Sequence, residues 1–225
     1  MHQPSRFHLV GHVICPYVQR VVILCTEKKI PYKRTDIELD NKPEWLLKIS
    51  PTAKVPVLIE SNATVLFDSN VICEYLDEIS SDSLHPKDVT EKAIHRAWIA
   101  FATEILDCIA KIIYRDNSCS CVNNSLREIT NKLQIVESVL SEGEFFAGCQ
   151  FHLVDAVYAT LFRYFDILGS LTTLELFSGV PRIRQWSEAL LDRPSVKNAV
   201  PCNYNELLIT FIKKRDSYIS QLDFS

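Results

Sequence analysis

The pattern of apolar residues changes abruptly near residue 80, and this change most constrains the fold. Before it, short apolar runs alternate with amphipathic stretches; after it, apolar residues recur mainly with the period of long helices. A polar segment at residues 80–90 separates the halves. With 225 residues, 47% of them hydrophobic, the chain is long enough to bury a sizeable core. The sequence therefore predicts an α/β half followed by an all-helical half.

The first half is predicted to alternate strands and helices. Pro16 marks a helix start, and Ser69 is predicted to cap a second helix that continues through Leu76. Runs that suit strands lie at residues 7–10, 32–39, 55–59 and 64–67, the last two joined as a hairpin.

The second half carries only helical patterns. They lie at residues 91–114, 124–141, 154–168, 181–192 and 203–220. The predicted organisation is a first domain over residues 1–82, a linker at 83–90 and a helical domain over 91–225.

Several common functions are excluded by the spacing of glycine and histidine. No two of the five glycines are two or four positions apart, which removes the dinucleotide motif G-x-G-x-x-G and the hydrolase motif G-x-S-x-G. Gly143 and Gly148 have P-loop spacing, but Cys149 stands where lysine is required. No histidine begins an H-E-x-x-H zinc motif.

The charge pattern argues against a nucleic-acid or membrane partner. The net charge is −4 and basic residues cluster over no more than three positions, 213–215. No stretch of 18 apolar residues and no apolar signal region occurs. The expected location is therefore the cytoplasm, where cysteines stay reduced.

Cys15 is the strongest candidate for a chemically reactive residue. It precedes Pro16 at a predicted helix start, where free backbone N–H groups and the helix dipole stabilise a thiolate. Cysteines so placed have pKa values of about 3.5–7.5, so fast reaction is expected below the pKa of about 8.5 of a free cysteine. The alternative is a small buried core residue.

No second thiol is placed to form a local disulfide with Cys15. A dithiol site needs a cysteine where Val18 stands, and Cys25 lies ten residues along the same predicted helix, about 15 Å away. A reactive Cys15 must therefore exchange with a thiol from solution, and glutathione is the obvious donor in a reducing cytoplasm.

The other cysteines are weaker candidates. Cys25 and Cys73 lie on apolar helix faces and are expected in the core. Cys119 and Cys121 form a C-x-C pair in a predicted polar loop, without the second pair or the nearby histidine that a metal site needs. No metal is predicted.

Four motifs of the first half carry a family resemblance. They are Cys15-Pro16-Tyr17-Val18, Asn41-Lys42-Pro43-Glu44-Trp45, residues 50–58 (S-P-T-A-K-V-P-V-L), and Asp68-Ser69 followed by residues 72–78 (I-C-E-Y-L-D-E). In order and spacing they resemble the glutathione transferase family, most closely its cysteine-containing omega class. The helical half is similar mainly in length and helix count. The resemblance implies a thioredoxin-like glutathione-binding domain followed by an all-helical domain.

The resemblance assigns the sulfur and glycine ends of glutathione to two motifs. Cys15, flanked by Pro16 and Tyr17, would meet the glutathione sulfur. Lys42 would pair with the glycine carboxylate, and Lys54 is a neighbouring charge with a weaker claim.

The other two motifs would hold the rest of the tripeptide. Val55 precedes Pro56, a cis proline in the family, and its backbone would pair with the cysteinyl part of glutathione. Asp68 would take the γ-glutamyl ammonium group. Ser69, at a helix N-terminus, would take the carboxylate.

The sequence departs from the family pattern at two positions. His152 stands where a helix-capping Ser or Thr usually precedes Asp155 by three residues, and Tyr17 replaces the usual Phe of the omega class. The second substrate is expected between the domains, with Tyr114 and Tyr204 as candidates for contacting it.

Three functions follow from the resemblance. The first is glutathione-dependent thiol transfer or reduction through a Cys15 mixed disulfide. The second is conjugation of glutathione to hydrophobic electrophiles, with Cys15 steadying the glutathione thiolate. The third is a non-catalytic regulatory or structural protein, against which the complete set of motifs argues. The resemblance also implies a homodimer.

Overall fold

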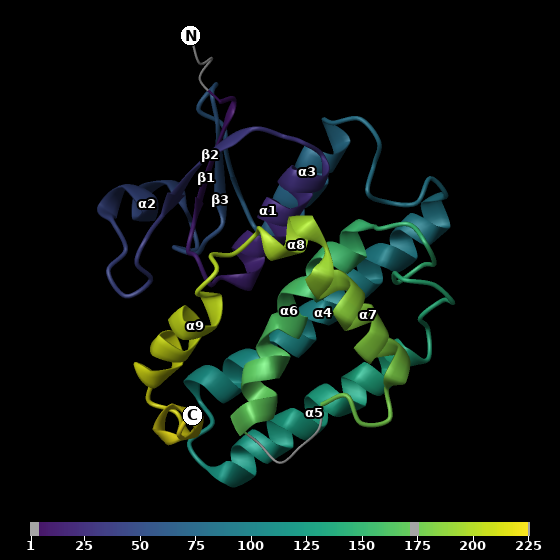
Figure 1. Cartoon of the computed structure of the whole chain (residues 1–225). Coiled ribbons are helices and arrows are strands. Elements are labelled where there is room, and N and C mark those ends of the chain that lie inside the picture. The colour runs from purple at the N-terminus through teal and green to yellow at the C-terminus, as the bar shows by residue number, and fades with distance from the viewer. Residues whose placement is uncertain (1–4, 172–175, 225) are drawn as a thin grey trace. The chain divides into compact units, whose positions relative to one another are not determined.

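The computed structural model describes residues 5–171 and 176–224, which fall into two compact units (Figure 1). One contains the chain up to Leu84, and the other begins at His85. The segment Lys197–Cys202 groups with the first unit, although the sequence assigned it to the helical domain. As predicted, the first unit is a small mixed sheet with helices and the second is helical.

Four strands form one mixed sheet in the first unit. They are β1 (Phe7–Gly11), β2 (Tyr32–Asp36), β3 (Val57–Glu60) and β4 (Val65–Phe67), in the order β2-β1-β3-β4. β1 pairs parallel with β2 and antiparallel with β3, which pairs antiparallel with β4.

Two strand boundaries differ from the prediction by more than one residue. β2 ends at Asp36 rather than at residue 39, because its partner β1 ends at the paired Gly11. β3 begins at Val57 rather than at residue 55, since Pro56 has no N–H to donate to the ladder.

Helices cover both faces of this sheet. Helix α2 (Glu44–Ile49) lies on one side, and α1 (Pro16–Glu27) and α3 (Ser69–Glu78) lie together on the other (Figure 1). Under α2, the buried cluster consists of Val10, Ile37, Leu46 and Val57. On the opposite face, every residue of α1 from Val18 to Cys25 is buried.

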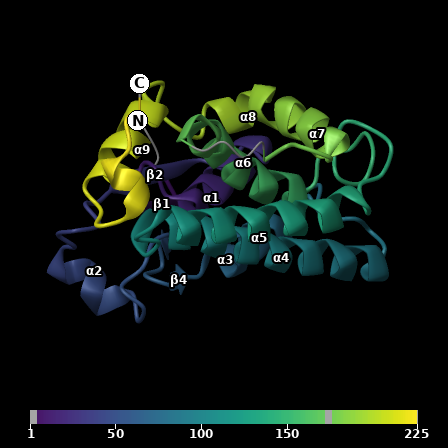
Figure 2. The same cartoon turned by 90° about the horizontal axis from the view of Figure 1, so that it is seen from below.

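The second unit contains α4 (Val89–Tyr114), α5 (Cys119–Glu137), α6 (Leu153–Leu171), α7 (Pro181–Asp192), the short α8 (Pro194–Lys197), α9 (Tyr204–Lys213) and the 3₁₀ helix η1 (Tyr218–Gln221). Figure 2 shows α4 and α5 side by side. Helix α6 packs against α4 and α7, and the rings of Tyr158 and Phe162 on α6 lie 4.8 and 5.3 Å from that of Trp186 on α7.

Several helix boundaries differ from the prediction, and three of the differences have a local explanation. Asp88 caps α4 two residues early, because its carboxylate accepts the N–H groups of residues 90 and 91. Ser118 likewise caps α5, so Cys119 and Cys121 lie in the first turn of a helix rather than in a loop. The helix expected over 203–220 is divided, and η1 is tied back by the Tyr218 N–H, which donates to the Asp116 carbonyl at 2.8 Å.

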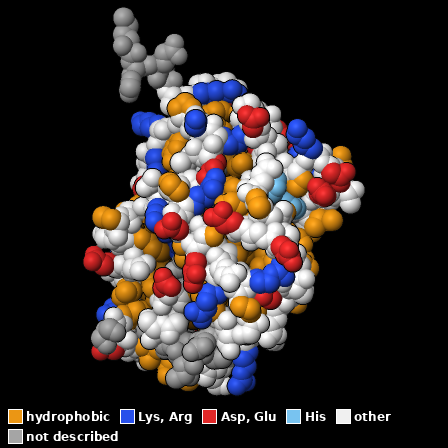
Figure 3. All heavy atoms as spheres, turned by 45° about the vertical axis from the view of Figure 1, so that its right-hand side comes forward, with side chains coloured by type: hydrophobic (Ala, Val, Ile, Leu, Met, Phe, Trp, Pro, Cys, Tyr) orange, Lys and Arg blue, Asp and Glu red, His pale blue; other side chains and the backbone are white. Residues whose placement is uncertain are grey.

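The face in Figure 3 carries acidic and basic side chains interspersed with apolar ones, without a continuous basic area among its described residues. Within residues 5–171 and 176–224, no helix is both long and apolar enough to cross a bilayer.

Candidate active site

The strand register brings the four motifs to one edge of the sheet. At this edge Gly11 ends β1 beside Asp36 of β2, Val57 begins β3, and Phe67 ends β4 opposite Val57. The segments that follow β1, β2 and β4, and the one that precedes β3, therefore all leave from the same edge. They carry the candidate residues Cys15, Pro16 and Tyr17, Lys42, Lys54, Val55 and Pro56, and Asp68 and Ser69.

Cys15 occupies the N-cap position of α1, as predicted. Its carbonyl accepts the N–H groups of Val18 and Gln19 at 3.1 and 3.0 Å, and its side chain is half-buried. Pro16 is the first helical residue, and Tyr17 lies with its ring 4.9 Å from the guanidinium carbon of Arg20.

The expected low pKa of Cys15 is wrong for the protein without a ligand. Burial raises the pKa of the thiol above its ordinary value, although the N–H groups of Val18 and Tyr17 lower it, as does the positive charge of Arg20. The cost of burying a thiolate thus outweighs the stabilisation that the N–H groups at the start of α1 give it. At neutral pH the thiol is more fully protonated than that of a free cysteine.

The segments around α2 and before β3 place two lysines and a proline at this edge. Lys42 is half-buried and Lys54 is exposed, so both ammonium groups remain within reach of solvent. The bond between Val55 and Pro56 is cis, as the family resemblance implies.

Asp68, rather than Ser69, caps α3. Its Oδ1 accepts the N–H groups of Asn70 at 2.8 Å and Val71 at 3.2 Å, and Ser69 becomes the first helical residue, buried with 6% of its surface exposed. Asp68 has a φ of 71°, which residues other than glycine rarely adopt. Such strain concentrates at functional sites, where the surrounding structure enforces it.

The two tyrosines proposed for the second substrate lie in the helical unit and differ in exposure. Tyr114, at the end of α4, is 48% exposed and has the Phe211 ring at 5.9 Å and the Arg215 guanidinium at 5.6 Å. Tyr204 is only 4% exposed, and the Arg163 guanidinium lies 5.6 Å from its ring. Its role in the structure is therefore packing within the helical unit.

The family is decided by comparison with known proteins. Residues 14–79 match the glutathione S-transferase N-terminal domain, and residues 97–194 match the glutathione S-transferase C-terminal domain. The chain belongs to the glutathione S-transferase family.

Relatives from an animal and from a plant are similar to this chain. Glutathione S-transferase omega-1 of Sus scrofa is 30% identical over 81% of this chain and 75% of its own. A probable glutathione S-transferase of Glycine max is 31% identical over 86% and 87%. The fold is shared with rice GST1, solved in complex with glutathione, at a TM-score of 0.81, 22% identity, and 95% and 99% coverage.

Arg20 is a residue of this glutathione S-transferase that the sequence analysis missed. It stands in the uninterrupted buried stretch of α1, fully buried, with its Nη1 donating to the Asn70 Oδ1 at 2.7 Å. The only signal in the sequence is an arginine on a helix whose neighbouring positions are apolar.

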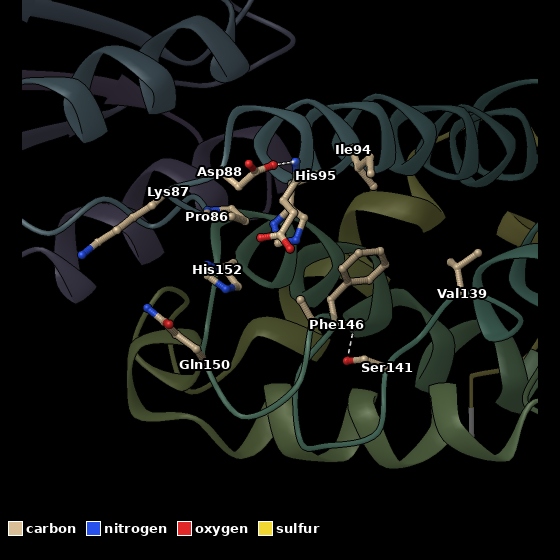
Figure 4. Close-up of a pocket in the computed structure, with 12 residues that line it drawn as sticks. Pro86, Lys87, Asp88, Ile94, His95, Val139, Ser141, Phe146, Gln150 and His152 are labelled. Carbon is tan, nitrogen blue, oxygen red and sulfur yellow. Dashed lines mark hydrogen bonds between the residues drawn. The ribbon is translucent and has the colours of Figure 1, made fainter.

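A separate pocket of about 450 Å³ lies in the helical unit, where the start of α4 meets the α5–α6 connection (Figure 4). His95 of α4 and His152 lie next to each other there, with ring centroids 4.9 Å apart, and Phe146 lies 5.5 Å from His95. Burial and the nearby His152 and His85 lower the pKa of His95 to about 4. The His95 imidazole is therefore neutral at pH 7, and it packs against the rings of Phe146 and His152 without burying a charge.

This buried histidine predicts a loss of stability in acid. Because the folded pKa of His95 lies below its ordinary 6.5, its favourable contribution is complete above pH 6.5 and is lost as the pH falls toward 4. We expect the wild type to lose about 2–3 kcal/mol more than His95→Gln between pH 7 and pH 4.5. Urea unfolding at both pH values measures this difference, and parallel losses in the two proteins would contradict it.

Proposed function

We propose that the protein is a glutathione-dependent thiol transferase of the omega type, in which Cys15 forms a mixed disulfide with glutathione. The observation that carries the proposal is the position of Cys15 at the N-cap of α1, on the sheet edge from which the other three motifs also leave. Support comes from the similarity to the pig omega-1 protein and from the glutathione bound in the rice structure.

In this proposal each motif holds one part of the tripeptide. Lys42 pairs with the glycine carboxylate, with Lys54 close by, and the Val55 backbone, ahead of Pro56, pairs with the cysteinyl unit. The buried Ser69 at the start of α3 receives the γ-glutamyl carboxylate, and the exposed Asp68 receives its ammonium group. The glutathione sulfur then lies at Cys15, beside Pro16 and Tyr17.

The chemistry is two successive thiol–disulfide exchanges. The Cys15 thiolate attacks the glutathionyl sulfur of a mixed disulfide, forming a Cys15–glutathione bond while the substrate thiolate leaves and takes a proton. A free glutathione, as its thiolate, then attacks the glutathionyl sulfur on Cys15. Glutathione disulfide leaves, and Cys15 returns to the thiolate. For each substrate disulfide reduced, one free glutathione is consumed, and it leaves joined to the glutathionyl group that the substrate carried, as glutathione disulfide.

One observation favours conjugation as a second candidate function. Burial raises the pKa of Cys15, and a neutral thiol steadies the thiolate of bound glutathione by donating a hydrogen bond. Glutathione would then attack a hydrophobic electrophile directly, with the exposed Tyr114 near the second substrate; the buried Tyr204 is a weaker candidate for that contact. The similarity to the soybean protein leaves this class open.

Binding of glutathione tests what both functions share. Isothermal calorimetry should detect glutathione and S-methylglutathione at millimolar concentration or below. Lys42→Ala should weaken binding at least about tenfold through the loss of a charge-assisted contact, whereas Lys48→Ala, an exposed lysine on α2, should not. No heat with either ligand would leave only a non-catalytic role for the fold.

Two further expectations belong to this proposal. The protein is expected to act in the cytoplasm and to form a homodimer. Light scattering that finds only monomer at micromolar concentration would overturn the second.

A further inference from the structure

The pocket in the helical unit is a preformed cavity with three buried rings in its lining. They belong to His95, Phe146 and His152, which are 4%, 5% and 7% exposed. The Asp155 carboxylate accepts the backbone N–H groups of Phe146 and His152 at 2.8 Å each, so the backbone that carries two of these rings is held in place without a ligand. The volume of about 450 Å³ suits a small organic molecule.

This pocket has a polar end and an apolar end. Figure 4 shows Asp88, His95 and His152 toward one end and Ile94 and Val139 toward the other. The two aliphatic side chains are 49% and 42% exposed, so a ligand that covers them removes apolar surface from water. A ligand of this pocket is therefore expected to be amphiphilic, with a polar group at one end and an apolar body at the other.

The polar end carries negative charge from the start of α4. Asp88, Glu91 and His95 are spaced i, i+3 and i+7, so they lie along one face of this helix, and all three line the pocket. Both acids are exposed, whereas His95 is buried and its Nδ1 has no hydrogen-bond partner. A neutral imidazole has one nitrogen that accepts an N–H donor. Two carboxylates beside an unsatisfied imidazole suit a ligand with positively charged N–H groups.

Three observations disfavour an anion at this end. The Asp88 Oδ1 already accepts two N–H groups of the first turn of α4, at 2.9 Å each, so these donors are taken. The Lys87 side chain extends away from the two histidines (Figure 4). Burial and neighbouring imidazoles lower the pKa of His95 to about 4, so its ring supplies no positive charge at pH 7. His152 is the other basic side chain of the lining, and an anionic ligand is therefore one arm of the test.

We propose that this pocket binds a small amphiphilic amine, whose ammonium group pairs with Glu91 and donates a hydrogen bond to His95. The apolar body of the amine covers Ile94 and Val139. Asp88, with one carboxylate oxygen occupied by N–H groups of α4, adds negative charge to the polar end. All lining residues belong to the helical unit, so this inference is independent of the reaction proposed for Cys15.

The test compares three ligands that share a phenylethyl body and differ in the polar group: 2-phenylethylamine, 2-phenylethanol and 3-phenylpropionate. Ligand-observed NMR titration of the full chain at neutral pH measures each affinity. The amine should bind in the low-millimolar range, at least about fivefold more tightly than the alcohol, and the carboxylate should bind most weakly. An amine that binds no more tightly than the alcohol, or a carboxylate that binds as tightly as the amine, would overturn the proposal.

The place of binding is tested on histidine-labelled protein. The ring signals of His95 and His152 should shift when 2-phenylethylamine is added, whereas those of His8 in the first unit should not. The variant His95→Phe assigns the His95 signals. Binding of the amine without a shift of the His95 and His152 signals would place it elsewhere and would overturn the assignment of this pocket.

Variants of the polar end test the two contacts of the ammonium group. Glu91→Gln removes the charge and keeps the shape, so it should weaken binding of the amine about fivefold and leave the alcohol unchanged. Asp107→Asn is the matched control. Asp107 is an exposed acid on the same helix, about 24 Å from Glu91 along its axis and beyond the screening length of about 8 Å, so this variant should change the affinity less than about twofold.

His95→Phe keeps a buried ring but removes both nitrogens, and it should also weaken binding of the amine about fivefold. Equal effects of Glu91→Gln and Asp107→Asn on the affinity for the amine would contradict the ion pair, and wild-type affinity in a folded His95→Phe variant would contradict the hydrogen bond; either result would overturn the proposal. If His95→Phe does not fold, Glu91→Gln and its control decide alone.

Discussion

Replacing Cys15 with alanine is expected to abolish glutathione-dependent reduction of a mixed disulfide, with a fall of at least about 10³-fold, because the variant has no nucleophile for the covalent intermediate. No other described cysteine lies at a helix start on the sheet edge that carries the motifs. Conjugation of an aromatic halide should survive or rise in the same variant, since bound glutathione brings its own thiol. A two-substrate assay, with circular dichroism to confirm folding, measures both rates.

The matched control for this experiment is Cys149→Ala. Cys149 is exposed in the helical unit, so its removal should leave both rates unchanged. Four exposed cysteines also mean that glutathione disulfide adducts must be assigned by peptide rather than counted on the intact protein. Intact reduction with lost conjugation in Cys15→Ala would overturn Cys15 as the redox nucleophile. Loss of both activities in a folded Cys15→Ala variant would show only that Cys15 has a role in binding.

The sequence was most informative where a residue type permits few backbone conformations. Proline after Cys15 predicted the start of α1, and the structure has Pro16 as the first helical residue. This feature is local, so it can be read from neighbouring residues.

Features that depend on distant segments could not be predicted. The pKa of Cys15 is set by burial, which the sequence near Cys15 does not report. The hydrogen bond from the buried Arg20 to Asn70, fifty positions away, exists only because α3 packs against α1. The capping of α3 by Asp68 instead of Ser69 depends on a positive φ, which the sequence pattern did not indicate.

Asp155 is another residue whose importance comes from distant partners. Its Oδ1 accepts the Phe146 N–H and the Trp186 Nε1–H, and its Oδ2 accepts the His152 N–H, all at 2.8 Å. The sequence analysis noted His152 in place of a capping Ser or Thr. In a capping box, a side chain three residues further along accepts the backbone N–H of the capping residue, and Asp155 accepts the His152 N–H in this way. The His152 side chain packs its ring on His95.

Asp155→Ala is therefore expected to lower the melting temperature by on the order of 10 °C. It leaves three buried N–H donors without an acceptor, each costing about 1–3 kcal/mol, partly offset because burying the carboxylate is itself unfavourable. A net loss of about 4 kcal/mol corresponds to such a shift in a chain of this size. Thermal unfolding followed by circular dichroism measures it, with Asp166→Ala, an exposed residue on the same helix, as the matched control.

The pH dependence of this loss distinguishes the effect of the Asp155 hydrogen bonds from that of general packing. Burial raises the pKa of Asp155 to about 6, although the three N–H donors lower it. Because the folded value lies above the ordinary 3.8, the stability that Asp155 provides is greatest in acid and falls as the pH rises through 6. The difference in unfolding free energy between wild type and Asp155→Ala should thus be about 1 kcal/mol larger at pH 5 than at pH 8. An equal difference at both pH values would show that Asp155 titrates normally in the folded chain.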